Sequence, residues 1–111
     1  MAYDEEFANR IREELADVDG ITEKAMFGGL AFLLAGNMAV GIMSTGDLMV
    51  RVGAEGTEEA LARPHTRLFE MRGRSMTGWV IVERDAVRTK RQLAPWVRRG
   101  TAFAASLPPK G

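Results

Sequence analysis

Cysteine is absent from this 111-residue sequence, and histidine occurs once, as His65. The lack of cysteine excludes disulfide bonds, thiolate metal ligands and cysteine nucleophiles. A single histidine argues against a zinc site and against a histidine-based catalytic triad, because both arrangements need partners that one imidazole cannot supply. We therefore expect no catalytic residues, no metal site and no cofactor.

Long apolar runs are also missing, since none approaches the roughly 20 residues that a membrane helix needs. The acidic segment 1–7 does not have the pattern of a signal peptide. We expect a cytoplasmic protein without membrane contact. The composition, 46% hydrophobic and 27% charged, is typical of a globular protein. A chain of this length suits one core, so we expect a single domain over residues 1–111.

The net charge is zero, but the two halves of the chain differ in sign. Residues 1–59 carry twelve acidic and four basic side chains, a formal charge of −8. Residues 60–111 carry three acidic and eleven basic ones, a charge of +8. The halves could pack together and neutralise each other, or the basic half could form a face for an anionic partner. We favour the first interpretation, because the whole domain lacks the basic excess of nucleic-acid-binding proteins.

A cluster of basic residues in the second half is the candidate patch for an anionic partner. Trp79 and Trp96 lie near it in sequence, and basic residues interleaved with aromatic ones can bind nucleic acid. Both tryptophans take core-facing positions in their predicted elements, however, so we expect no direct binding of nucleic acid. The patch comprises Arg84, Arg88, Lys90, Arg91, Arg98 and Arg99.

The centre of the chain, residues 24–53, shows the alternation of a β-meander. Three apolar stretches, 30–34, 38–43 and 48–52, have a period of two, which predicts strands joined by the glycine-containing turns 35–37 and 44–47. This phase places Met38, Val40 and Ile42 on one face. Residues 22–27 lead into the meander, and 68–71 and 79–83 predict a fourth and a fifth strand.

Helices are predicted before and after this sheet. Phe7, Ile11 and Leu15 recur at helical spacing, which predicts a helix over 4–16 with Asp4 as its N-cap. A short helix over 57–63 has Thr57 as its candidate N-cap, and a last helix covers 93–106 with Pro95 in its first turn. The fold class is therefore α+β, with an N-terminal helix, an antiparallel sheet of about five strands and a C-terminal helix. One core should contain Phe7, Ile11, Leu15, Phe32, Val40, Ile42, Val50, Val80, Trp96 and Phe103.

Two adjacent glycines, Gly28 and Gly29, interrupt the apolar run between Phe27 and Leu30. Glycine weakens a strand, so the pair needs a structural reason. A bulge or tight bend is the first interpretation, and close approach of another backbone or of a ligand is the second. A phosphate-binding loop does not fit, because no Lys-Ser or Lys-Thr follows.

The second face of the meander is also apolar, with Arg51 as its polar exception, although a solvated face would alternate to polar residues. We expect a homodimer in which a second copy covers this face. The alternative is a monomer in which helix 57–63 folds over it. The face comprises Ala31, Leu33, Ala39, Gly41, Met43 and Met49, and the candidate interaction residues are Met26, Phe27, Gly28, Gly29, Leu33, Met43 and Met49.

Several of these segments resemble the N-terminal domain of the TfoX/Sxy family of competence regulators. The resemblance covers nearly the whole chain and lies in residues 26–32 (MFGGLAF), 36–39 (GNMA), 48–51 (LMVR), 78–80 (GWV), 96–97 (WV) and 106–108 (SLP). It implies a compact α+β domain that dimerises and acts as a regulatory or interaction module. Full competence regulators carry a further C-terminal domain, and we expect a stand-alone N-terminal domain here.

Two functions follow from these observations. The leading hypothesis is a non-enzymatic regulatory module with a protein partner in the transcription machinery, as the resemblance implies. The alternative is a module that binds a small molecule or a peptide at the Gly28-Gly29 bend and the methionine-lined sheet. Methionines in strands usually fill space in the hydrophobic core, and less often they line a groove for a ligand or a partner.

Overall fold

Six strands form one antiparallel sheet in the computed structural model, which describes residues 3–26 and 28–109. The strand order is β1-β2-β3-β4-β6-β5, so four strands form a meander and β6 then lies between β4 and β5. The strands are β1 (Ile21–Met26), β2 (Gly29–Leu34), β3 (Asn37–Ile42), β4 (Leu48–Arg51), β5 (Thr66–Met71) and β6 (Arg74–Val82).

The predicted α+β class is confirmed, with one strand more than the approximate count. The additional strand is β1, which pairs with β2 along its whole length. Its central residues, from Thr22 to Ala25, are all exposed. An edge strand of this kind lacks apolar alternation, and therefore the period of two could not reveal it.

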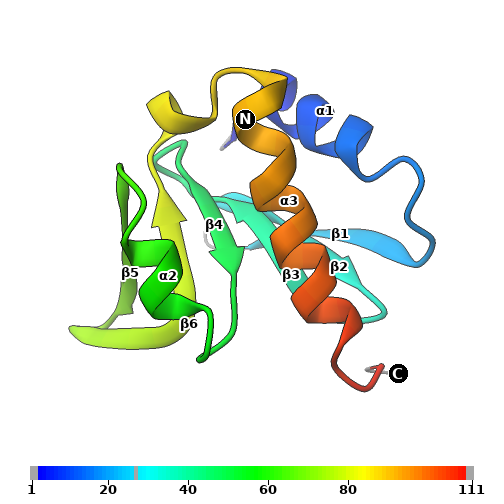
Figure 1. Ribbon diagram of the computed structural model, residues 1–111. Coiled ribbons are helices and arrows are strands. Elements are labelled where there is room, and N and C mark those ends of the chain that lie inside the picture. Colours follow the sequence, from blue (N-terminus) through cyan, green and yellow to red (C-terminus); the bar gives the residue numbers. More distant parts are fainter. Residues whose placement is uncertain (1–2, 27, 110–111) are drawn as a thin grey trace.

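All three α-helices lie on one side of the sheet (Figure 1). Helix α3 packs against β3 and β4, α1 packs against α3, and the short α2 lies against β5 and β6. None of the helices in the described residues has the length and apolar character that crossing a membrane requires. The helices are α1 (Glu5–Glu14), α2 (Thr57–Leu61) and α3 (Lys90–Ala105), with a 3₁₀ turn, η1 (Arg84–Val87), before α3.

The hydrophobic core lies between these helices and the sheet face beneath them. Phe7, Ile11, Phe32, Val40 and Val50 are completely buried in it. The predicted core is confirmed except for Phe103, which is only half-buried. The core also contains Leu48, Val82, Val87, Leu93 and Val97.

The helix ends agree only partly with the prediction. Asp4 caps α1, accepting hydrogen bonds from the backbone N–H groups of Glu6 (2.9 Å) and Phe7 (3.4 Å). Helix α3 begins three residues earlier than predicted, because Thr89 and Gln92 form a capping box. Pro95 therefore lies in the second turn of α3 and not in the first.

Thr57 is the first residue of α2, so its predicted role as the N-cap is wrong. Gly56 takes the cap position, without a side-chain hydrogen bond. The buried Thr57 hydroxyl donates to the Gly53 carbonyl oxygen (2.8 Å) and accepts from the Gly78 N–H (2.9 Å). Thr57 therefore joins the start of α2 to the middle of β6.

Ion pairs between the two halves of the chain confirm that the halves pack together and neutralise each other. Arg84 pairs with Asp4 (2.9 Å) and Arg67 pairs with Asp47 (3.5 Å). Further pairs join Lys90 to Glu14 and Arg99 to Glu59. Part of the opposite charge of the two halves is thus neutralised by ion pairs within the fold.

Arg12 joins α1 to the edge strand β1. Its Nε and Nη2 donate to the two carboxylate oxygens of Glu23, both at 2.7 Å, and its Nη1 donates to Glu5 at 3.1 Å. The hydrogen bonds from Arg12 favour the carboxylate form of Glu23, so the pKa of Glu23 lies below its ordinary value of 4.5.

Glu23→Gln is expected to reduce the loss of stability in acid. Because the pKa of Glu23 is lower in the folded protein, the contact contributes stability above pH 4.5 and loses it as the pH falls through the folded pKa. The melting temperature of the variant, followed by circular dichroism, should fall less steeply below pH 4.5 than that of the wild type. Glu13→Gln, at an exposed position on α1, is the control. If the melting temperatures of the two variants fell equally steeply with pH, the stabilising role of the Glu23 carboxylate would be contradicted.

Candidate functional site

The sheet face opposite the helices contains an apolar groove with a cavity of about 200 Å³. Ala31 and Gly41 lie buried at its centre, and the side chains around them come from β1, β2, β3, β4 and β5. None of the lining residues that the structure describes is titratable. We call this surface the methionine groove; it is lined by Met26, Leu30, Ala31, Met38, Gly41, Ile42, Met43, Met49, Phe69 and Met71.

Several candidate interaction residues from the sequence meet at this surface. Met26, Met43 and Met49 line the groove. Leu33 is half-buried and pairs with Met38, one of the lining residues. Gly28 and Gly29 come two and three residues after Met26, and Gly29 is its partner in the β1–β2 ladder. Phe27 lies outside the described residues.

The groove also contains Met38, Phe69 and Met71, which the sequence interpretation did not select. A register irregularity between Phe32 and Leu33 pairs Phe32 with Val40 and Leu33 with Met38. One residue of β3, Ala39, is thus bulged, and the phase of the strand changes there. The assignment of Met38 to the same face as Val40 is therefore wrong. The abundance of methionine in the strands was the sequence feature that could have indicated this groove.

The two interpretations of the glycine pair apply to different glycines. Gly28 has φ of +76°, so it supplies the backbone bend between β1 and β2. Gly29 is buried in β2, where a Cβ atom would overlap the carbonyl oxygen of Ile42 in β3. The second glycine thus permits close approach of a neighbouring backbone.

Helix α2 does not cover the groove, so the alternative in which it folds over the second face is wrong. Arg99 of α3 donates to the Gly56 carbonyl oxygen at 3.0 Å and pairs with Glu59. Ala60 is completely buried in the core. These contacts place α2 beside α3, on the helical side (Figure 1).

Four of the six residues of the predicted basic patch make ion pairs within the fold. Arg84 turns toward α1, where it pairs with Asp4 and lies 4.1 Å from the ring centre of Phe7. Hydrogen bonding from Arg84 holds the pKa of Asp4 below its ordinary value. Arg88 pairs with Asp85 at 2.8 Å.

Two more members of the patch are also engaged within the fold. Lys90 pairs with Glu14 at 3.8 Å, and Arg99 holds Glu59 and the backbone of Gly56. The pKa of Glu59 is lowered, because Arg63 and then Arg99 hydrogen-bond to its carboxylate.

The remaining members, Arg91 and Arg98, are exposed and make no ion pair with the side chains that the structure describes. Trp96 lies in the core as predicted. Trp79 does not: it is half-buried, and the Arg51 guanidinium lies 4.8 Å from its ring centre. Arg91 and Arg98 are therefore the members of the patch whose charge is not already paired with a described carboxylate.

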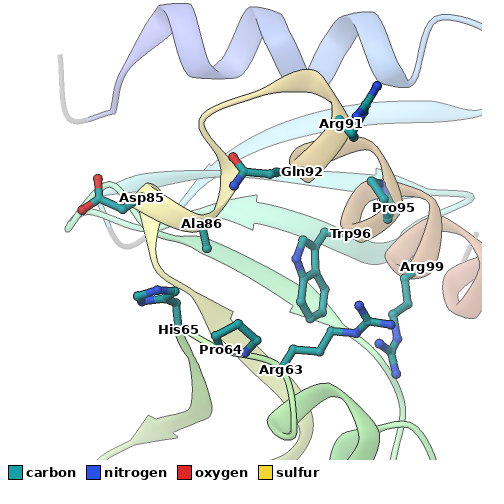
Figure 2. A pocket seen from close by; sticks show the side chains of 10 residues that line it. All are labelled: Arg63, Pro64, His65, Asp85, Ala86, Arg91, Gln92, Pro95, Trp96 and Arg99. Atoms are coloured by element: carbon teal, nitrogen blue, oxygen red, sulfur yellow. The ribbon is translucent and has the colours of Figure 1, made fainter.

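A second cavity, of about 440 Å³, lies on the helical side between the end of α2, η1 and the start of α3 (Figure 2). It brings Arg91 and Arg99 from the predicted patch together with residues that the sequence interpretation did not group. We call it the arginine pocket. Its lining residues are Arg63, Pro64, His65, Asp85, Ala86, Arg91, Gln92, Pro95, Trp96 and Arg99.

These features define an α+β domain with a six-stranded antiparallel sheet that its helices cover on one face only. The family model of the TfoX N-terminal domain matches residues 13–104. The chain therefore belongs to the TfoX N-terminal domain family, and the resemblance found in the sequence is confirmed. A search of curated proteins gave no match.

Proposed function

We propose that this protein is a non-enzymatic interaction module that works as a homodimer through the methionine groove. The observation that carries the proposal is the apolar sheet face, which is free of helices throughout the described part of the chain. Met71 and Met76, on the β5–β6 hairpin, are 40% and 36% exposed. Exposed apolar surface of this kind is typical of a contact site.

A second copy of the chain is the occupant that fits this surface best. The described lining carries no charge, so it offers no ion pair to a charged partner. The partner surface that covers it must therefore be apolar as well. The same face of another copy is such a surface, and a two-fold arrangement closes on itself. Flexible methionine side chains can adapt to one another across the contact.

The size of the cavity favours a protein over a small molecule. Small-molecule sites usually have volumes of about 300–1,000 Å³, and the groove holds about 200 Å³. A small ligand would therefore remain largely exposed. This weakens the alternative of a small-molecule site at the glycine bend, whereas a flat protein contact needs no deep cavity.

The regulatory role belongs to the same proposal and rests on family membership. A homodimer of this kind would act by contact, in the cytoplasm, with a protein partner in the transcription machinery. The titratable side chains that catalysis requires do not line the groove.

Light scattering on a size-exclusion column at tens of micromolar protein is expected to give a dimer mass. Leu33→Glu and Met43→Glu should each give a monomer, because a carboxylate buried in an apolar contact is costly. Circular dichroism melts verify that the variants remain folded. Ala105→Glu, at an exposed position of α3, is the matched control and should stay dimeric. A wild-type monomer rejects the dimer, and a dimer mass for both Leu33→Glu and Met43→Glu would reject this interface.

A further inference from the structure

We propose that the arginine pocket binds a small phosphorylated ligand with a flat ring, of the size of a nucleoside monophosphate. The pocket lies on the helical side of the sheet, so it is independent of the methionine groove. Its volume of about 440 Å³ falls within the range of about 300–1,000 Å³ that small-molecule sites occupy.

The charge of the lining selects an anion. Three arginines line the pocket, Arg63, Arg91 and Arg99. Asp85 is the only carboxylate among the lining residues that the structure describes, and Arg88 already neutralises it at 2.8 Å. The pocket is therefore net positive even with a neutral His65.

Arg63 and Arg99 form the candidate phosphate site. They approach each other at one end of the pocket (Figure 2), and both bind the carboxylate of Glu59. One carboxylate between two guanidinium groups leaves a positive charge without a counterion. Glu59 also holds the pair in position before a ligand arrives, which lowers the entropic cost of binding.

Both arginines keep hydrogen-bond donors for a ligand. Arg63 uses only its Nη2 atom, toward Glu59, and Arg99 uses only its Nη2 atom, toward Glu59 and the Gly56 carbonyl oxygen. Their Nε and Nη1 atoms make no hydrogen bond within residues 3–26 and 28–109. A guanidinium presents its N–H groups as a planar fork, which suits two oxygens of one phosphate.

The rest of the lining suits a flat ring. Pro64, Ala86 and Pro95 contribute apolar surface, and the Trp96 indole, which is 8% exposed, forms the inner wall. Gln92 uses its side-chain oxygen in the capping box, where it accepts from the Thr89 N–H at 3.1 Å. Its amide N–H₂ group therefore remains available for an acceptor on the ring.

Isothermal titration calorimetry of the full chain tests this with four probes: AMP, UMP, adenosine and inorganic phosphate. We expect at least one nucleotide to bind with a Kd below about 1 mM. Adenosine and inorganic phosphate should each bind about tenfold more weakly or worse, because each lacks half of the contacts. Absence of binding by both nucleotides, or equal binding of nucleotide and either fragment, would overturn the proposal.

Two arginine variants locate the site. Arg63→Ala should weaken nucleotide binding about tenfold, because it removes one of the two guanidinium groups of the phosphate site. Arg63 is exposed and its pair with Glu59 spans only one helical turn, so the variant should melt like the wild type. Arg98→Ala removes the same charge from an exposed position of α3 outside the pocket and should bind normally. Equal weakening by both variants would indicate nonspecific attraction and reject the site.

Discussion

Gly29→Ala is expected to unfold the protein or to lower its free energy of unfolding by about 3 kcal/mol or more. The added methyl group would overlap the Ile42 carbonyl oxygen of β3. A backbone atom cannot move aside as the end of a flexible side chain can, so β2 and β3 would have to separate. Chemical denaturation followed by circular dichroism measures the loss, and Gly29→Val should be at least as severe.

Gly73→Ala is the control that separates backbone strain from atomic overlap. Gly73 lies in the β5–β6 turn with φ of +78°, and no atom lies within 4 Å of the position that a Cβ would take. A side chain in this left-handed conformation costs about 1–2 kcal/mol. A loss for Gly29→Ala no larger than that for Gly73→Ala would show that Gly29 does not limit the spacing of β2 and β3.

Phe32→Ala is expected to cost about 3–5 kcal/mol. Phe32 is completely buried on β2, in the core between the sheet and the helices. The substitution removes the burial of an aromatic ring and leaves a cavity, and both terms destabilise. Small domains have total stabilities of about 5–15 kcal/mol, so the variant should lose a large share of its stability. The midpoint of denaturation reports the loss.

Phe69→Ala is the matched control for Phe32→Ala. Phe69 is half-buried and lines the methionine groove on the other face of the sheet. Its truncation should cost less than half as much as that of Phe32, measured at one protein concentration, so that any association contributes equally. Similar losses would contradict a core that lies on one side of the sheet.

The elements that the sequence predicted correctly are those with strong local signals. The spacing of Phe7, Ile11 and Leu15 placed α1, and alternating apolar residues placed β2, β3 and β4. The strand β1 was missed because its exposed side chains carry no alternation. The start of α3 was misplaced although the Thr89-Gln92 capping box was present in the sequence.

The candidate sites were predictable only in part. Met26, Met43 and Met49, which the sequence suggested as interaction residues, line one groove in the structure. Met38 was assigned to the wrong face, because a bulge changes the phase of β3. No distinctive residue in the sequence marks the position of this bulge. The basic patch was predicted as one surface, yet Arg84 turned toward α1.

Local sequence patterns were sufficient to establish the α+β class, the central meander and membership of the TfoX N-terminal domain family, because these depend on periodicity and motifs within short segments. Which residues meet at the two surfaces could be read from the tertiary structure alone. The insertion of β6 between β4 and β5 sets the position of β5, and with it the place of Phe69 in the groove. The packing of α2 beside α3 brings Arg63 to Arg99 around Glu59. Such contacts depend on strand register and helix packing between distant segments, which local patterns do not encode.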